Sequence, residues 1–108
     1  LEFARVHKER GHEAYALRLL GMVAAQDDLP DGVAAATSYQ QALALANELG
    51  MRPLQAHCHL SLGTLACKVG QQEEARGELS TAIEMYRSMD MTFWLPPAET
   101  ALRQVQGR

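Results

Sequence analysis

The chain has 108 residues, 47% of them apolar and 21% charged, and its formal net charge is −3 at pH 7. This length supports one domain with a buried core, while the acidic balance excludes the basic face that nucleic-acid binding requires. Because no apolar run is long enough to span a bilayer and no leader peptide is visible at the N-terminus, we expect a soluble cytoplasmic protein whose partners include neither nucleic acid nor a membrane.

The first predicted element is the end of an earlier helix, which occupies residues 1–10 and turns polar before Gly11. Since the sequence opens on Leu1 rather than on Met, we expect the chain to be part of a longer protein. A second helix is predicted from His12 to Gln26, because its apolar residues recur at intervals of three and four. The residues of this stripe, which we expect to be buried, are Tyr15, Ala16, Leu19, Leu20 and Val23.

A reversal of the chain is predicted over residues 27–31, which are rich in aspartate and include Pro30. Asp31 is placed to cap the N-terminus of the next helix, which we predict over residues 32–49. Gly50 follows and can adopt the left-handed conformation that ends many helices. The stripe of this helix consists of Ala35, Tyr39, Ala42, Leu43, Ala46 and Leu49.

A second hairpin is predicted over residues 53–89, with Pro53 in the first turn of its first helix and a stop at Gly70. Two glutamates then fall in the first turn of the next helix, where the helix dipole favours acidic side chains. An amphipathic stretch over residues 95–106 follows, and we predict that it forms a capping helix.

The hairpins over residues 12–49 and 53–89 repeat one pattern. A period near 40 that is built from two helices is typical of an α-solenoid, in which each hairpin must stack on its neighbours. We therefore predict an all-α solenoid of antiparallel hairpins. The small residues of the pattern let the two helices of a hairpin approach closely. Ala14, Leu17, Leu20 and Gly21 recur 42 positions later as Ala56, His59, Leu62 and Gly63, and Ala35, Tyr39 and Ala42 recur 40 positions later as Ala75, Leu79 and Ala82.

These residues resemble the tetratricopeptide repeat, a helix-turn-helix unit that stacks into a right-handed superhelix. The second hairpin is the closer match, although Ala66 stands where an aromatic residue is common and His59 where a large apolar residue is common. Residues 46–63 and 89–95 also resemble C-terminal repeat arrays of large bacterial signalling proteins. Those proteins join a nucleotide cyclase or a DNA-binding regulator domain to an ATPase module, so the resemblance implies a scaffold in a signalling protein.

The resemblance also implies a groove that binds a peptide and is lined by the first helix of each hairpin. Carried over by position, the groove contains Arg18 and Lys68, two cations that could hold a peptide carboxylate, with Arg able to do so in a bidentate manner. The alternative at each position is an ordinary solvated side chain. The remaining groove residues are Tyr15, Met22, His57 and Thr64.

Metal binding, calcium binding and catalysis are expected to be absent. His57, Cys58 and His59 are adjacent, whereas ligands on one helix favour spacings of three or four. We expect His59 at a packing position within its hairpin, with His57 facing the groove. The aspartates of residues 27–31 lack the ligand pattern of a helical calcium site. With no nucleophile elbow, phosphate loop or metalloprotease helix, we expect neither a cofactor nor an enzyme.

Two functions stay open at this point. The first is a protein-binding scaffold that takes a peptide or helix in the groove, and the second is a structural spacer that self-associates. Phe93, Trp94 and Leu95 form the densest apolar cluster, in which either Trp94 seals the last hairpin or the terminus pairs with another copy. A homodimer through the exposed ends of the repeats is therefore the alternative.

Overall fold

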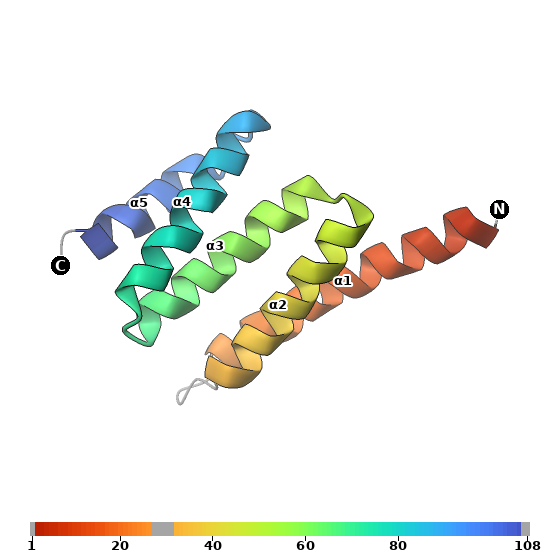
Figure 1. Cartoon of the computed structure of the whole chain (residues 1–108), viewed down its shortest axis with the longest axis horizontal. Helices are drawn as coiled ribbons and strands as arrows, with labels where there is room; N and C mark the ends of the chain where they lie inside the picture. Colours follow the sequence, from red (N-terminus) through yellow and green to blue (C-terminus); the bar gives the residue numbers. More distant parts are fainter. Residues whose placement is uncertain (1, 27–31, 107–108) are drawn as a thin grey trace.

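A computed structural model describes residues 2–26 and 32–106, and for residues 2–7 it describes the backbone alone. Within these ranges the chain forms five helices that pack as neighbours in chain order (Figure 1), which confirms the all-α class. The reversal predicted over residues 27–31, with its cap at Asp31, lies outside the described residues. The helices are α1 (Glu2–Gln26), α2 (Gly32–Leu49), α3 (Arg52–Lys68), α4 (Gln72–Ser88) and α5 (Leu95–Gln106).

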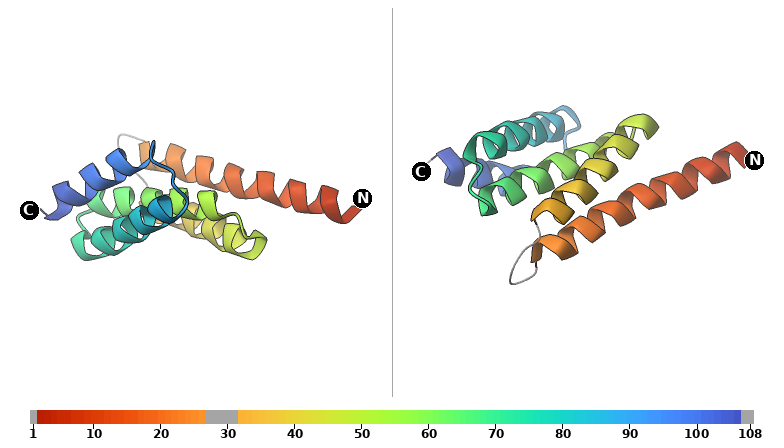
Figure 2. Two further views of the ribbon diagram at one scale, coloured as in Figure 1. Left: turned by 90° about the horizontal axis from the view of Figure 1, so that it is seen from above. Right: turned by 60° about the horizontal axis from the view of Figure 1, so that its bottom comes forward.

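The helices form an elongated body of 52 × 33 × 19 Å, with the two ends of the chain at opposite ends of its long axis (Figure 1). The odd-numbered helices lie toward one side and α2 and α4 toward the other (Figure 2). Each helix packs on the next one along the chain, and smaller contacts join α1 to α3 and α3 to α5. The central helix α3 therefore touches every other helix of the described chain.

The prediction of a separate helix over residues 1–10 is wrong, because α1 runs without a break from Glu2 to Gln26. A glycine inside a helix costs only about 1 kcal/mol relative to alanine, and neighbouring contacts offset that cost here. A side chain at Gly11 would meet the Met51 sulfur at 3.6 Å, and Arg10 forms an ion pair of 2.7 Å with Glu48 of α2. Contacts with Glu48 of α2 and with Met51, which follows α2, thus support α1 at the predicted stop.

The stripe predicted to be buried on α1 is also wrong, since its large members face outward. Leu19 and Leu20 are each 60% exposed and Val23 is 63% exposed. The line that α1 buries against α2 consists instead of small residues, Ala14, Gly21 and Ala25. The spacing of the apolar residues predicted a helix correctly, but this helix packs through its smaller residues rather than through its larger apolar ones.

Three helix ends share one backbone geometry at positions 50, 70 and 90. Gly50 and Gly70 have φ of 69° and 82°, as predicted for a left-handed stop, and Asp90 takes the same conformation at 57°. In each case the amide that follows this residue reaches back to close the last turn, the pattern of a Schellman motif. The three bonds join Met51 N to Ala46 O (2.9 Å), Gln71 N to Ala66 O (2.8 Å) and Met91 N to Tyr86 O (2.9 Å).

The two hairpins also share one packing device, in which a large side chain of the second helix lies over a glycine of the first. A Cβ at Gly21 would come within 2.6 Å of the Tyr39 ring, and a Cβ at Gly63 would come within 2.7 Å of Leu79 Cγ. Both large side chains are buried. The small residues predicted to allow close approach therefore do so in both α1–α2 and α3–α4.

The helix α5 closes the other end of the molecule. Ala98 packs in a cluster with Ala82, Ile83 and Tyr86, and the half-buried Trp94 lies on the edge of the same cluster. Phe93 is 80% exposed. Trp94 thus packs against the core under α5, and Phe93 lies on the surface.

Candidate functional site

A hollow of about 220 Å³ lies between α1 and α3 and gathers four of the six predicted groove residues. Arg18 and Met22 come from α1, and Thr64 and Lys68 come from the last turns of α3. The two helices bring together residues that are more than forty positions apart in sequence. The other lining residues were not predicted from the sequence; they are Ala25, Gln26, Tyr39, Leu60, Ser61 and Leu65.

Arg18 is held in place from the opposite helix. Its Nε donates a hydrogen bond of 3.1 Å to the Ser61 hydroxyl, and Ser61 is nearly inaccessible at 9% exposure. Since a guanidinium has five N–H donors, this contact fixes the side chain while leaving it able to donate to a bound group. The repeat held a signal for this partner. Shifted by 42 residues, Leu19 falls on Ser61, a polar residue where the first hairpin has an apolar one.

Lys68 stands at the other end of the hollow, and it too contacts the facing helix. Its ammonium donates a hydrogen bond of 3.1 Å to the main-chain carbonyl of Ala25, in the last turn of α1. Carbonyls in a last turn have no partner within the helix, so the cation also suits the negative end of the α1 dipole. Two of the three ammonium donors remain for a ligand.

The charge of Arg18 acts on several buried groups around it. Burial raises the pKa of Tyr39, and the nearby guanidinium opposes this rise. Burial also raises the pKa of the Cys58 thiol to about 11, again with Arg18 acting in the opposite direction. The thiol is therefore protonated at neutral pH, a form that is neither a nucleophile nor a metal ligand.

His57 and Tyr15 do not line this hollow. The His57 ring is half-buried, with its Nδ1 at 2.7 Å from the Tyr86 hydroxyl and its centroid at 4.6 Å from that of Trp94. Burial, with a smaller contribution from Arg18, lowers the pKa of His57 to about 4. Tyr15 is 46% exposed on the surface of α1. The structure thus places His57 in an aromatic cluster under α5 rather than among the hollow's lining residues.

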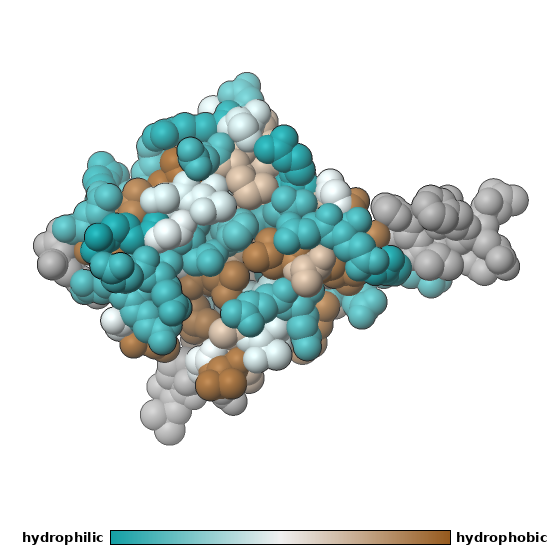
Figure 3. Space-filling view, in the orientation of Figure 1, coloured by the Kyte–Doolittle hydropathy of each residue, from teal (hydrophilic) through white to brown (hydrophobic). Residues whose placement is uncertain are grey.

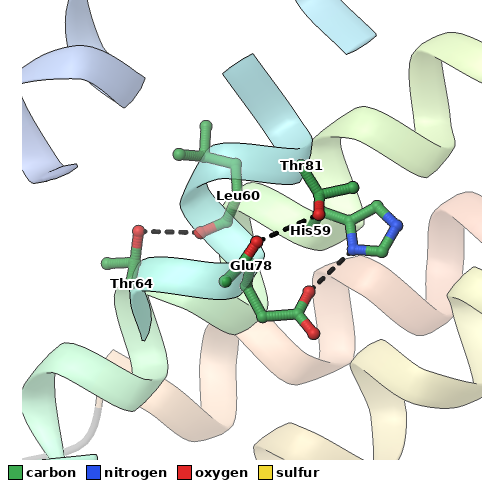
Figure 4. A network of polar contacts seen from close by, with 6 residues as sticks. His59, Leu60, Thr64, Glu78 and Thr81 are labelled. Atoms are coloured by element: carbon green, nitrogen blue, oxygen red, sulfur yellow. Dashed lines mark hydrogen bonds and ion pairs between the residues drawn. The ribbon is translucent and has the colours of Figure 1, made fainter. Parts of the chain in front are cut away.

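His59 lies inside the second hairpin, as predicted from its position in the repeat. Its Nδ1 is 2.7 Å from Oε2 of Glu78 on α4, and both side chains are partly exposed (Figure 4). The hydroxyl of Thr64 on the same helix donates to the Leu60 carbonyl at 2.9 Å. Because this bond is local to α3, it leaves the Thr64 hydroxyl able to accept a hydrogen bond from a ligand.

No group of three histidine, cysteine or carboxylate side chains gathers as a metal site among the residues that the structure describes. The aspartates that were weighed as a calcium site lie in residues 27–31, outside the described ranges. None of the described helices is long and apolar enough to cross a membrane.

Larger hollows elsewhere on the described chain differ from this one in charge. One of about 610 Å³ lies between α2, α3 and α4, and the ionisable residues among its lining are the carboxylates Glu74 and Glu78. The hydrophobic hollow that is visible beside α2 and α3 in Figure 3 belongs to this face. Another, of about 440 Å³ between α4 and α5, carries charges of both signs. Of these three, the α1–α3 hollow is the one whose ionisable lining includes cations and no carboxylate.

Comparison of the chain with models of protein families, with curated proteins and with solved structures gave no match. The protein is thus described by its all-α fold of paired helices and by the cationic hollow between α1 and α3.

Proposed function

We propose that this chain is a protein-interaction module that binds a carboxylate-bearing peptide in the hollow between α1 and α3. The observation that carries the proposal is the placement of Arg18 and Lys68 in one hollow, each oriented by a hydrogen bond to the facing helix. Two fixed cations favour an anion, and an arginine can hold a carboxylate through two parallel hydrogen bonds.

The size and lining of the hollow favour a peptide over a compact small molecule. Its volume of about 220 Å³ is below the roughly 300–1,000 Å³ of typical small-molecule pockets. Met22 and Leu65 supply apolar surface beside the cations. A short acidic peptide fits this chemistry, because one apolar side chain fills the hollow while a carboxylate contacts Arg18 or Lys68.

The repeated packing supports an architecture similar to the tetratricopeptide repeat, with hairpins stacked as a solenoid. The glycine notch and the helix-end geometry recur at the spacing expected for such units. By the same resemblance, we place the module in a larger bacterial signalling or regulatory protein of the cytoplasm. The function is then binding rather than catalysis, and neither a metal nor another cofactor takes part.

The test is peptide binding by charge-reversed variants. A peptide array that varies the number and position of carboxylates would supply a fluorescent ligand, and its dissociation constant would be measured by anisotropy. We expect Arg18→Glu with Lys68→Glu to weaken binding at least about 100-fold, since each favourable contact becomes a like-charge repulsion. Arg76→Glu with Arg103→Glu, on exposed helix surfaces outside the hollow, is the matched control and should retain binding.

Circular dichroism would establish that the charge-reversed variant keeps its helices. Lys68→Met alone, which removes charge without reversing it, should weaken binding by a smaller factor and report on the site even if the double variant unfolds. The proposed site would be wrong if Lys68→Met bound the peptide as tightly as the natural chain and if the two double variants had equal effects on peptide binding.

A further inference from the structure

The exposed side of α1 is the largest uncovered row of apolar side chains on the described helices. We call it the open face of α1. Its large members are Tyr15, Leu19, Leu20 and Val23, which are 46%, 60%, 60% and 63% exposed, and Ala16 lies among them. Between residues 14 and 26 the one charged side chain is Arg18, which turns away from this row to reach Ser61 on α3.

The internal repeat shows what such a face does elsewhere in the molecule. A shift of 42 residues carries Ala16, Leu20 and Val23 of the open face onto the side of α3 that packs on α2, where Cys58 clusters with Ala42 and Ala46. Tyr15 shifts instead onto His57, whose ring lies beside Tyr86 and Trp94. A further shift of 40 carries it onto the side of α5 that packs on α4. The equivalent residues are Ala16, Leu19, Leu20 and Val23 on α1, Cys58, Ser61, Leu62 and Leu65 on α3, and Ala98, Ala101, Leu102 and Val105 on α5.

In both of the other places these positions are covered. Cys58 and Ala98 are fully buried, and Leu65 and Val105 are 5% and 3% exposed. The covering helix is in each case the preceding neighbour along the chain, which runs antiparallel to the face that it covers (Figure 1). The open face of α1 is therefore the same surface without its helix among the described residues.

The opposite end of the molecule has a different surface. The exposed surface of α5 carries polar and proline residues, among them Thr100, Arg103 and Gln104. A polar face of this kind needs no further helix to cover it in water. A head-to-tail contact would bury Arg103 against apolar side chains, which costs free energy unless the charge is paired.

We infer that the open face of α1 binds the same face of a second copy of this chain, with the two α1 helices antiparallel about a twofold axis. The face carries no charge of its own, so pairing it with itself brings no like charges together. A twofold axis gives the antiparallel direction that α2 has to α3. With the axis between Leu19 and Leu20, the small Ala16 lies opposite Val23 of the second copy, so a large side chain meets a small one.

The size of the face sets the strength of the dimer. Four large side chains at these exposures present roughly 400 Å² per copy, or about 800 Å² for the pair, which is below the approximately 1,200 Å² of stable interfaces. The dimer is therefore weak and reversible and forms at high micromolar concentration. This interface is separate from the proposed peptide site, so either can fail without the other.

Sedimentation velocity from about 10 µM to about 1 mM tests the inference on the whole chain. We expect the weight-average mass to rise toward that of a dimer. Leu19→Glu with Val23→Glu should raise the dissociation constant at least tenfold, because an unpaired charge is buried at the interface. Val33→Glu is the matched control, since Val33 is 80% exposed on α2 and lies outside the face, and it should leave the dissociation constant unchanged.

The geometry of the pair has its own measurement. In a chain that also carries Cys67→Ser, Leu20→Cys should form a disulfide between two copies of the chain on mild oxidation. Arg103→Cys in the same background should not. A strict monomer over the whole concentration range would overturn the inference. The inference would also fail if Val33→Glu weakened the dimer as much as the double variant of Leu19 and Val23. It would fail as well if, in a mixture, Leu20→Cys cross-linked to Arg103→Cys and formed no disulfide between its own copies.

Discussion

The hairpins α1–α2 and α3–α4 use the same packing device in different surroundings. In both, a glycine of the first helix receives a large side chain of the second, Tyr39 over Gly21 and Leu79 over Gly63. The helix α3 has a second neighbour on its other side, whereas the corresponding side of α1 is uncovered. The first helix of each hairpin thus has two packing surfaces. One packs on the second helix of its own hairpin, and the other, in α3, packs on the hairpin before it.

The largest expected effect comes from filling the notch of the central hairpin. Gly63→Leu places a Cβ within 2.7 Å of Leu79 Cγ and 3.2 Å of the Leu79 amide nitrogen, and overpacking at this site should cost about 3 kcal/mol of unfolding free energy. Urea denaturation followed by circular dichroism measures it. Gly77→Ala is the control, since nothing lies within 4 Å of its Cβ, and it should stabilise the chain by about 0.7 kcal/mol. If Gly63→Leu left the free energy of unfolding unchanged, the close packing of Leu79 over Gly63 would be contradicted.

A matched pair of truncations compares the covered face with the open face. Leu65→Ala removes a side chain that is 5% exposed in a cluster with Ala35 and Tyr39, and it should cost about 2.5 kcal/mol. Val23→Ala, at the equivalent position of α1 and 63% exposed, should change stability by less than about 0.5 kcal/mol in the monomer. Thermal melts at low protein concentration measure both. Similar losses from the two variants would show that the open face is covered within the monomer.

Acid should weaken the second hairpin through His57. Its pKa is about 4 in the folded chain, below the ordinary value of 6.5, so the unfolded chain binds more protons between these values. The stability that neutral His57 contributes is therefore present above pH 6.5 and is lost as the pH falls toward 4. Because the ring is half-buried and partly screened by solvent, we expect a loss on the order of 1 kcal/mol.

The measurement is urea stability at pH 7 and at pH 4.5 for the natural chain and for His57→Gln. The variant should lose the His57 part of the pH dependence, whereas His12→Gln, which changes an exposed residue of α1, should retain it. An unchanged pH dependence in His57→Gln would assign the acid sensitivity to other groups.

The smallest expected effects come from the three helix ends. Gly70→Ala forces a side chain into a φ of 82° and Gly50→Ala into a φ of 69°, and each should cost about 1 kcal/mol. Asp90→Gly relieves a φ of 57° and should gain about 0.5 kcal/mol. Thermal unfolding of the three variants measures these changes, and opposite signs at positions 70 and 90 would establish that the left-handed conformation is the cause.

Much of the fold could be predicted from the sequence because it depends on local signals. Glycine at 50 and 70 and the period of apolar residues were enough to predict α2 over 32–49 and α5 over 95–106. Gly11 was misread, because a single glycine is compatible with a helix when another helix packs beside it. The orientation of α1 was also missed, since Ala14, Gly21 and Ala25 contribute little hydrophobicity although they form its contact line.

The candidate site was predictable only in part. The groove was expected from the resemblance to the tetratricopeptide repeat, which assigns it to the first helix of each hairpin. Four of the six residues expected there line the hollow, namely Arg18, Met22, Thr64 and Lys68. His57 could not be placed correctly, because its surroundings come from Tyr86 and Trp94, which lie 29 and 37 residues further along the chain. Such distant aromatic contacts leave no periodic signal near residue 57.

The equal helix ends at positions 50 and 90 have a consequence for how this protein can change in length. The segment 51–90 begins after one left-handed turn and finishes on another of the same geometry. A tandem duplication of these forty residues would therefore join like to like at the junction, and the added unit would meet the chain in the register that its neighbours already use.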